Sequence, residues 1–136
     1  MARSKCYFDI NIVLDIIDSS RLNHALSISL LRQLVLHEQK ICISEDMLST
    51  IYYISKDKKA TLEFFENIVY VDWEVVSFGI DVIKVATQKA LHESLDLEDL
   101  LQCLCAKENG CHLFVTKDKK FYDCGIKIVG YEYFEI

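Results

Sequence analysis

Apolar and polar residues alternate along the chain in two patterns, short apolar runs and longer stretches with helical spacing. The short runs predict five strands, at residues 6–9, 41–43, 68–71, 112–115 and 126–129. Helical spacing predicts helices at residues 12–17, 22–36, 47–54, 60–67 and 75–91. A further helix is predicted by the stripe Leu97, Leu100, Leu101, Leu104 and Cys105, and Asn109-Gly110 ends it. Strands alternating with helices predict an α/β fold, a mostly parallel central sheet of about five strands with helices on both faces.

Length and composition favour one globular domain over residues 1–136. Hydrophobic residues make up 51% of the chain and charged residues 26%. The N-terminal apolar stretch is interrupted by Asp15, Asp18 and Arg21, so no segment is apolar enough to span a membrane, and no signal peptide is evident. We therefore expect a cytoplasmic protein that has no membrane partner and keeps its six cysteines reduced.

The cysteines favour a structural role over metal binding or thiol chemistry. Cys6 and Cys42 fall inside predicted strands, and Cys103 and Cys105 fall inside a predicted helix, where a free cysteine packs as a small apolar residue. Cys103-Leu-Cys105 lacks the two-residue spacer of a zinc or thioredoxin motif, and no histidine pair accompanies it. Zinc binding and thiol catalysis are therefore not favoured.

Charge and glycine usage exclude several function classes. The net charge of −6 and pI near 5.1 argue against binding nucleic acid through the overall field, although a bound cation would still allow a nuclease. The scattered glycines provide no phosphate-binding loop. A phosphoaspartyl hydrolase would need an acid where Asn11 stands, and a receiver domain fits poorly with Asp72 after the middle strand.

Carboxylates follow the ends of predicted strands or open predicted helices. Asp9 follows the first strand, Asp118 follows residues 112–115, and Asp96, Glu98 and Asp99 open a helix. Open α/β sheets keep their sites at the carboxyl ends of the strands, and oxygen ligands suit hard divalent cations. The sequence therefore predicts a metal site built from sequence-distant acids.

Each of these residues also has a structural explanation. Capping of the helix is the favoured role for Asp96, Asp118 fits a turn, and Thr116 is an ordinary strand former. The lysines beside Asp118 could be solvated surface. Asp9 lacks such an explanation, because it ends an apolar strand.

Four segments together resemble the PIN-domain family of nucleases, across nearly the whole chain. Phe8-Asp9-Ile10-Asn11 and the apolar helix after it are similar to the family's opening Asp-x-Asn strand and helix. Residues 43–54 are similar to its second segment, 96–111 to its third and 115–121 to its fourth. The resemblance implies cleavage of single-stranded RNA assisted by Mg²⁺ or Mn²⁺. Bacterial members include the virulence-associated, VapC-like ribonuclease toxins of toxin–antitoxin pairs.

The resemblance also assigns roles. Asp9, Asp99 and Asp118 are implied as catalytic metal ligands, joined by Asp96 or Glu98. Residues implied to position water or substrate phosphate are Asn11, Thr50, Thr116, Lys117 and Lys119. Residues 22–36 and 51–65 are implied as surfaces for a homodimer and for an antitoxin helix.

One position departs from the family pattern. Thr50 stands where many members have Glu, and Glu45 and Asp46 precede it by about one helical turn, pointing elsewhere if the helix begins there. Asp96 or Glu98 could supply the missing oxygen, or Thr50 could hold a metal-bound water. The alternative to an active ribonuclease is a catalytically weakened PIN domain that binds protein or RNA.

Overall fold

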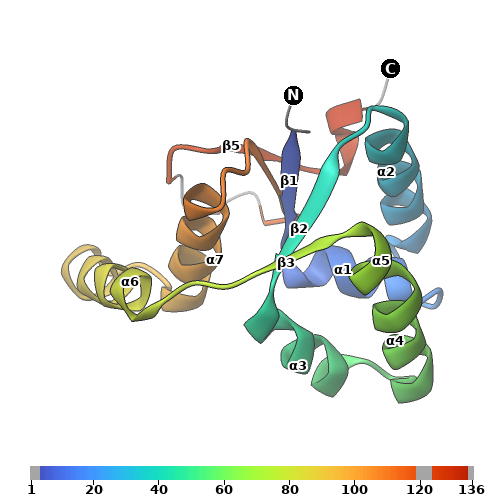
Figure 1. Cartoon of the computed structure of the whole chain (residues 1–136), viewed down its shortest axis with the longest axis horizontal. Coiled ribbons are helices and arrows are strands. Elements are labelled where there is room, and N and C mark those ends of the chain that lie inside the picture. Colours follow the sequence, from blue (N-terminus) through green and yellow to red (C-terminus); the bar gives the residue numbers. More distant parts are fainter. Residues whose placement is uncertain (1–3, 119–123, 135–136) are drawn as a thin grey trace.

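A five-stranded parallel sheet forms the centre of the protein. The structure, a computed structural model, describes residues 4–118 and 124–134. The strands lie in the order β3-β2-β1-β4-β5, and every neighbouring pair is parallel (Figure 1). Their bounds are Lys5–Phe8 (β1), Lys40–Ser44 (β2), Glu74–Val76 (β3), Leu113–Val115 (β4) and Lys127–Val129 (β5). The α/β fold with a parallel sheet is therefore confirmed.

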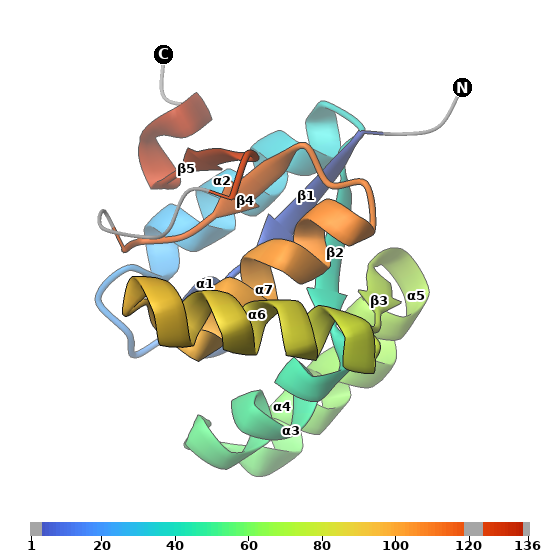
Figure 2. The ribbon, with the colours of Figure 1, turned by 90° about the vertical axis from the view of Figure 1, so that its left-hand side faces the viewer.

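Helices cover both faces of this sheet. The α-helices are α1 (Ile10–Ile17), α2 (His24–Leu36), α3 (Glu45–Ile54), α4 (Lys58–Phe64), α5 (Tyr70–Asp72), α6 (Ile80–Glu93) and α7 (Leu97–Glu108). A π-helical segment, η1 (Phe65–Val69), joins α4 to α5, and a 3₁₀ turn, η2 (Tyr131–Phe134), follows β5. Helices α6 and α7 lie on one side of the sheet, and α2, α4 and α5 lie on the other (Figures 1 and 2). Within the described residues, no helix combines the length and apolarity needed to cross a membrane.

The core lies between β1 and the helices on either side. Tyr7, Phe8, Ile12, Leu100 and Phe114 are fully buried, as expected for a central strand covered on both faces. The rings of Tyr7 and Phe114 stack across β1 and β4 with their centroids 5.2 Å apart. The helices that carry site residues are therefore anchored on a rigid centre.

The predicted strand at 68–71 and the predicted helix start at residue 75 are wrong. Residues 65–72 are helical because Phe65, Val69 and Trp73 are the buried positions, and their spacing of four is helical rather than alternating. The third strand is instead Glu74–Val76, paired with β2, and Gly79 is the N-cap of α6. A short apolar run fits either a strand or a buried helix, and packing decided between them.

The expectation that all six cysteines are reduced is also wrong. A disulfide joins Cys103 on α7 to Cys124, which precedes β5. The two residues are 21 positions apart, and only the tertiary fold brings their Cα atoms to 6.1 Å. Cys6, Cys42, Cys105 and Cys111 are free and buried, and for the first three this agrees with the predicted role in the core.

Candidate active site

Asp9 and Asp118 lie side by side at the carboxyl edge of the sheet. Asp9 directly follows β1, and Asp118 follows its neighbour β4. Phe8 and Val115 are partners in the parallel ladder, and the Asp9 N–H donates to the Val115 carbonyl at 3.0 Å. The register therefore brings together two acids that the sequence separates by more than a hundred residues.

Thr116 connects these two acids. Its Oγ1 donates a hydrogen bond to Asp9 Oδ2 at 2.7 Å and accepts one from the Asp118 N–H at 3.1 Å. Asp9 occupies the N-cap position of α1, yet its carboxylate makes no capping bond and is held by Thr116 instead. Thr116 is only 3% exposed, so its contribution goes beyond that of an ordinary strand residue.

Helix α7 brings Asp99 toward the same edge. Asp96 is the N-cap of α7 and accepts from the Asp99 N–H at 3.0 Å, which agrees with the prediction that Asp96 caps the helix. Partial burial raises the pKa of Asp99 to about 6, and neighbouring carboxylates add to the effect: Asp96, Asp118, Asp9 and Glu98. The charges of Asp9 and Asp118 thus reach Asp99.

The surroundings of Asp9 also raise the pKa of its carboxyl group. Burial raises the pKa of its carboxyl group, and the nearby charge of Asp118 raises it further. Hydrogen bonds from Thr116 and the Ile10 N–H, together with the charge of Lys117, act in the opposite direction. On balance the pKa of Asp9 is raised, so the folded environment disfavours its charged form.

The cluster fits a divalent cation in its chemistry. Carboxylate oxygens are the ligands that Mg²⁺ and Mn²⁺ prefer, and a cation would relieve the repulsion that raises the pKa of Asp99. In the described parts of the chain, no three Asp, Glu, His or Cys side chains are close enough to enclose one ion. Mg²⁺ commonly keeps several waters in its coordination shell and is often bound through only one or two carboxylates.

Replacing Asp99 with Asn is expected to stabilise the metal-free protein at pH 7, because it removes a partly buried charge that neighbouring carboxylates repel. The expected gain is only about 1 kcal/mol, since Asp99 is partly exposed and its charge is screened by solvent. The folded-state pKa near 6 exceeds the unfolded value near 4, so the gain is absent below about pH 4 and complete above pH 6. Urea unfolding at pH 4 and pH 7 measures it. An equal effect at both pH values, or in the exposed control Asp81→Asn, would contradict this origin.

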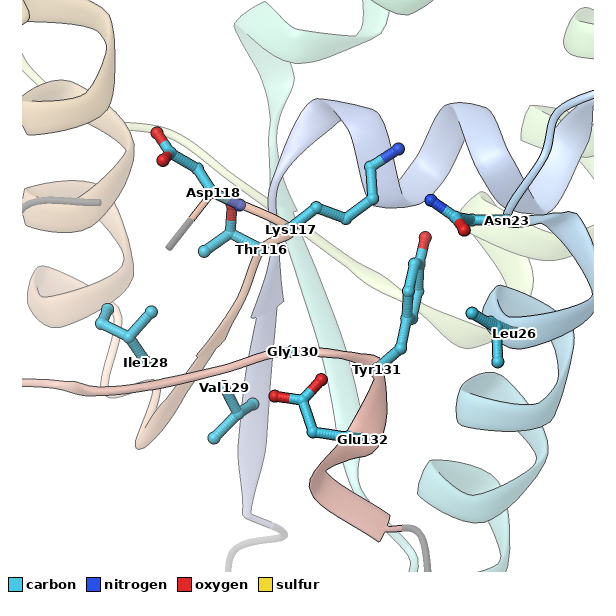
Figure 3. A pocket seen from close by; sticks show the side chains of 10 residues that line it. All are labelled: Asn23, Leu26, Thr116, Lys117, Asp118, Ile128, Val129, Gly130, Tyr131 and Glu132. Carbon is cyan, nitrogen blue, oxygen red and sulfur yellow. The ribbon is translucent and has the colours of Figure 1, made fainter. Parts of the chain in front are cut away.

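A buried network that the sequence did not predict supports Lys117. Asp15 on α1 is 1% exposed and forms ion pairs with Arg21 Nε at 2.7 Å and Lys117 Nζ at 3.0 Å. The Tyr131 hydroxyl also donates to it. Burial alone would raise the pKa of Asp15, but the hydrogen bonds from Tyr131, Arg21 and Lys117 lower it. Figure 3 shows Lys117 directed toward Tyr131 and Asn23, whereas Asp118 leaves the backbone in the opposite direction.

The remaining predicted residues lie around this edge. Lys117 was predicted to neutralise phosphate, but its amine is held by Asp15. Asn11 is exposed, and its Oδ1 accepts from Arg21 at 3.3 Å. Thr50 is exposed on α3, and Lys119 lies outside the described residues.

A cleft of about 710 Å³ adjoins the acid cluster on the β5 side. It shares Thr116, Lys117 and Asp118 with the edge, and Figure 3 shows the other walls formed from α2, β5 and η2. Its position gives an extended ligand space beside Asp118.

A second polar network lies on the β2 side. Ser44 ends β2 and is fully buried, and its Oγ donates to Asp46 Oδ1 and approaches Gln102 Oε1 at 3.3 Å. Gln102 on α7 also accepts from the Tyr7 hydroxyl and donates to Glu98 Oε1 at 3.0 Å. Gln102 stands between Leu101 and Leu104 of the predicted apolar stripe, and its partners Tyr7 and Ser44 are distant in the sequence.

The fold and this edge define an α/β protein with an acid cluster suited to a divalent cation at the switch point of a parallel sheet. The sequence matches the PIN domain over residues 6–127, and the chain belongs to the PIN-domain family. It is 34% identical over 142 residues to Ribonuclease VapC1 of Aquifex aeolicus (strain VF5), covering 98% of this chain and 95% of that protein.

Solved structures share the fold at low sequence identity. VapBC2 from Rickettsia felis, bound to a DNA fragment from its promoter, matches with a TM-score of 0.71 and 18% identity, covering 93% of this chain and 98% of that chain. VapC20 of Mycobacterium tuberculosis, a toxin that cleaves the sarcin–ricin loop, matches with a TM-score of 0.69 and 12% identity, covering 89% and 95%. A toxin–antitoxin complex from Klebsiella pneumoniae matches with a TM-score of 0.69 and 15% identity, covering 93% and 97%.

Proposed function

We propose that this PIN-domain protein is a metal-dependent ribonuclease that cleaves single-stranded RNA. The observation that carries the proposal is the position of Asp9 and Asp118 at the ends of neighbouring strands, joined through Thr116, with Asp99 close enough for their charges to raise its pKa. Ribonuclease VapC1 of Aquifex aeolicus aligns with almost the whole chain. The alternative of a catalytically weakened binding module gains no support from the compared proteins.

In this proposal, the acidic side chains bind the metal ion, and Thr116 orients one of them. Thr116 fixes one oxygen of Asp9, so the carboxylate is oriented before any ligand arrives. Asp99 lies in the first turn of α7 and Asp118 follows β4, so the three acids come from three separate elements. A Mg²⁺ or Mn²⁺ ion bound by these acids would polarise the phosphate and activate water. Asn11 and Thr50 are exposed beside this region and are proposed to contact water or phosphate.

The proposed partners follow from the same relatives and from exposed apolar side chains. Similar structures contain toxin–antitoxin complexes, so we assign this chain an antitoxin partner and a toxin role. Leu22, Val35 and Leu36 near or on α2, and Tyr53 and Ile54 on α3, are exposed, and such surfaces favour protein contacts. A homodimer and a cytoplasmic location, where RNA is available, belong to the same proposal.

Cleavage of an RNA with single-stranded segments tests the proposal. Purified protein is expected to cut this RNA with Mn²⁺ or Mg²⁺ and to lose the activity with chelator, because the carboxylates alone cannot neutralise the phosphate. Asp118→Asn is expected to cut at least about a hundredfold more slowly. The exposed Asp81→Asn is the matched control and should retain full activity.

Two outcomes would refute this function. Cleavage that survives chelation would exclude the metal-dependent chemistry, and equal cleavage by Asp118→Asn and wild type would place the activity elsewhere. Manganese binding without cleavage of a varied RNA pool would favour the binding module.

A further inference from the structure

We propose that Asp46 supplies the carboxylate that Thr50 lacks and is a ligand of the divalent cation at this edge. The proposal deepens the function proposed above and rests on it for the RNA chemistry. Its metal-binding part is tested separately. Three observations carry it: the position of Asp46 on α3, the hydrogen bonds that orient it, and the acceptor capacity that remains on its carboxylate.

The first observation is helical geometry. Helix α3 begins at Glu45, so Asp46 lies in its first turn. Asp46 and Thr50 are four residues apart in one helix, which places them on the same face, one turn from each other. This geometry favours a shared face for Asp46 and Thr50 over the expectation that Asp46 points elsewhere. An acid at position 46 lies on the face of Thr50 but nearer the sheet.

The sheet register brings this first turn beside Asp9. Tyr7 and Cys42 are partners in the parallel ladder of β1 and β2. Asp9 lies two residues beyond Tyr7, and Ser44 lies two residues beyond Cys42, so both stand at the same level on neighbouring strands about 5 Å apart. Asp46 follows Ser44 closely and thus flanks Asp9 on the side opposite Asp118.

The second observation is the orientation of the carboxylate. Ser44 Oγ donates to Asp46 Oδ1 and also approaches Gln102 Oε1, and both Ser44 and Gln102 are buried. Gln102 donates in turn to Glu98, the neighbour of Asp99 on α7. The hydrogen bond from Ser44 therefore holds the Asp46 carboxylate near Gln102 of α7, the helix that also carries Asp99.

The third observation is the acceptor capacity that remains. Among the described residues, Ser44 is the only donor to the Asp46 carboxylate, and no Lys, Arg or His forms an ion pair with it. One hydrogen bond leaves most lone pairs of a carboxylate available. Asp46 is also exposed, so a hydrated cation can reach it. With Asp9, Asp99 and Asp118 it would contribute to binding an ion held partly through water, because no three described acids are close enough to enclose an ion directly.

Manganese binding to the purified full chain, measured by isothermal titration calorimetry without RNA, tests the assignment. Asp46→Asn is expected to weaken binding roughly tenfold, as expected for loss of one contributor to a metal site. Glu45→Gln is the matched control, because it removes the same charge one residue away in the same exposed turn, and its affinity should stay within about twofold of wild type. Thr50→Glu added to Asp46→Asn should restore most of the affinity.

Thermal unfolding of each variant is followed in parallel, and the rescue by Thr50→Glu guards against a general folding defect. Equal weakening by Asp46→Asn and Glu45→Gln would show a nonspecific charge effect and overturn the proposal. Unchanged binding in Asp46→Asn, or no manganese binding by wild type, would also overturn it. Specific loss of binding in Asp46→Asn, with no RNA cleavage by wild type, would support Asp46 and refute the ribonuclease.

Discussion

Asp9→Asn is expected to reduce RNA cleavage roughly a thousandfold while the protein stays folded. The substitution removes the charge at the centre of the acid cluster but keeps an oxygen that can accept from Thr116. Because burial and Asp118 disfavour the charged carboxylate, the free energy of unfolding should rise by up to about 1 kcal/mol without metal. Single-turnover cleavage with saturating Mn²⁺ and urea unfolding measure both effects.

Two comparisons make this result specific. Asp99→Asn should lose activity in the same way, and the exposed Asp81→Asn should not. Full activity of purified Asp9→Asn would exclude Asp9 as a metal ligand. Loss of activity together with a large fall in stability would mean instead that Asp9 holds the fold.

Asp15→Asn is expected to destabilise the protein by about 2–3 kcal/mol and to lower the Tm by roughly 10 °C. The carboxylate is 1% exposed and pairs with Arg21 and Lys117, which are themselves partly exposed and can regain some hydration. The Tyr131 hydroxyl would also lose its charged acceptor. Differential scanning calorimetry at pH 7 measures the change.

The pH dependence identifies the charge of Asp15 as the cause. Its folded-state pKa lies below the unfolded value near 4, so its contribution is present above that pH and is lost as the pH falls through the folded pKa. The gap between wild type and variant should therefore narrow below pH 4. Glu63→Gln breaks an exposed pair with Lys59 and should change stability by less than about 0.5 kcal/mol. A similar small effect for Asp15→Asn would contradict the buried network.

The acids at the sheet edge could be placed from the sequence because parallel topology makes their position a consequence of strand order. Asp9 and Asp118 each follow an apolar strand, and adjacent parallel strands end at the same edge. The capping role of Asp96 was also predictable, since a local motif decides it. Whether these acids bind metal stays a prediction.

The supporting residues could not be predicted because their partners are distant in the sequence. In the sequence, Asp15 is only a charged residue that interrupts an apolar stretch. Its partners Lys117 and Tyr131 reach it through tertiary packing. Gln102 occupies a helical face whose neighbours are Tyr7 and Ser44 from two different strands. The same holds for the bond between Cys103 and Cys124. Local patterns report on helix faces and strand ends, but not on which side chains meet there.

The hydrogen bond from Thr116 to Asp9 spans 107 residues, and it has a consequence for the order in which a newly made chain becomes active. Translation produces Asp9 more than a hundred residues before Thr116 and Asp118. β4 joins the sheet beside β1 only after β2, β3 and their crossover helices have been made. A nascent chain therefore cannot assemble the acid cluster until the segment that carries Thr116 and Asp118 has been synthesised and has reached β1.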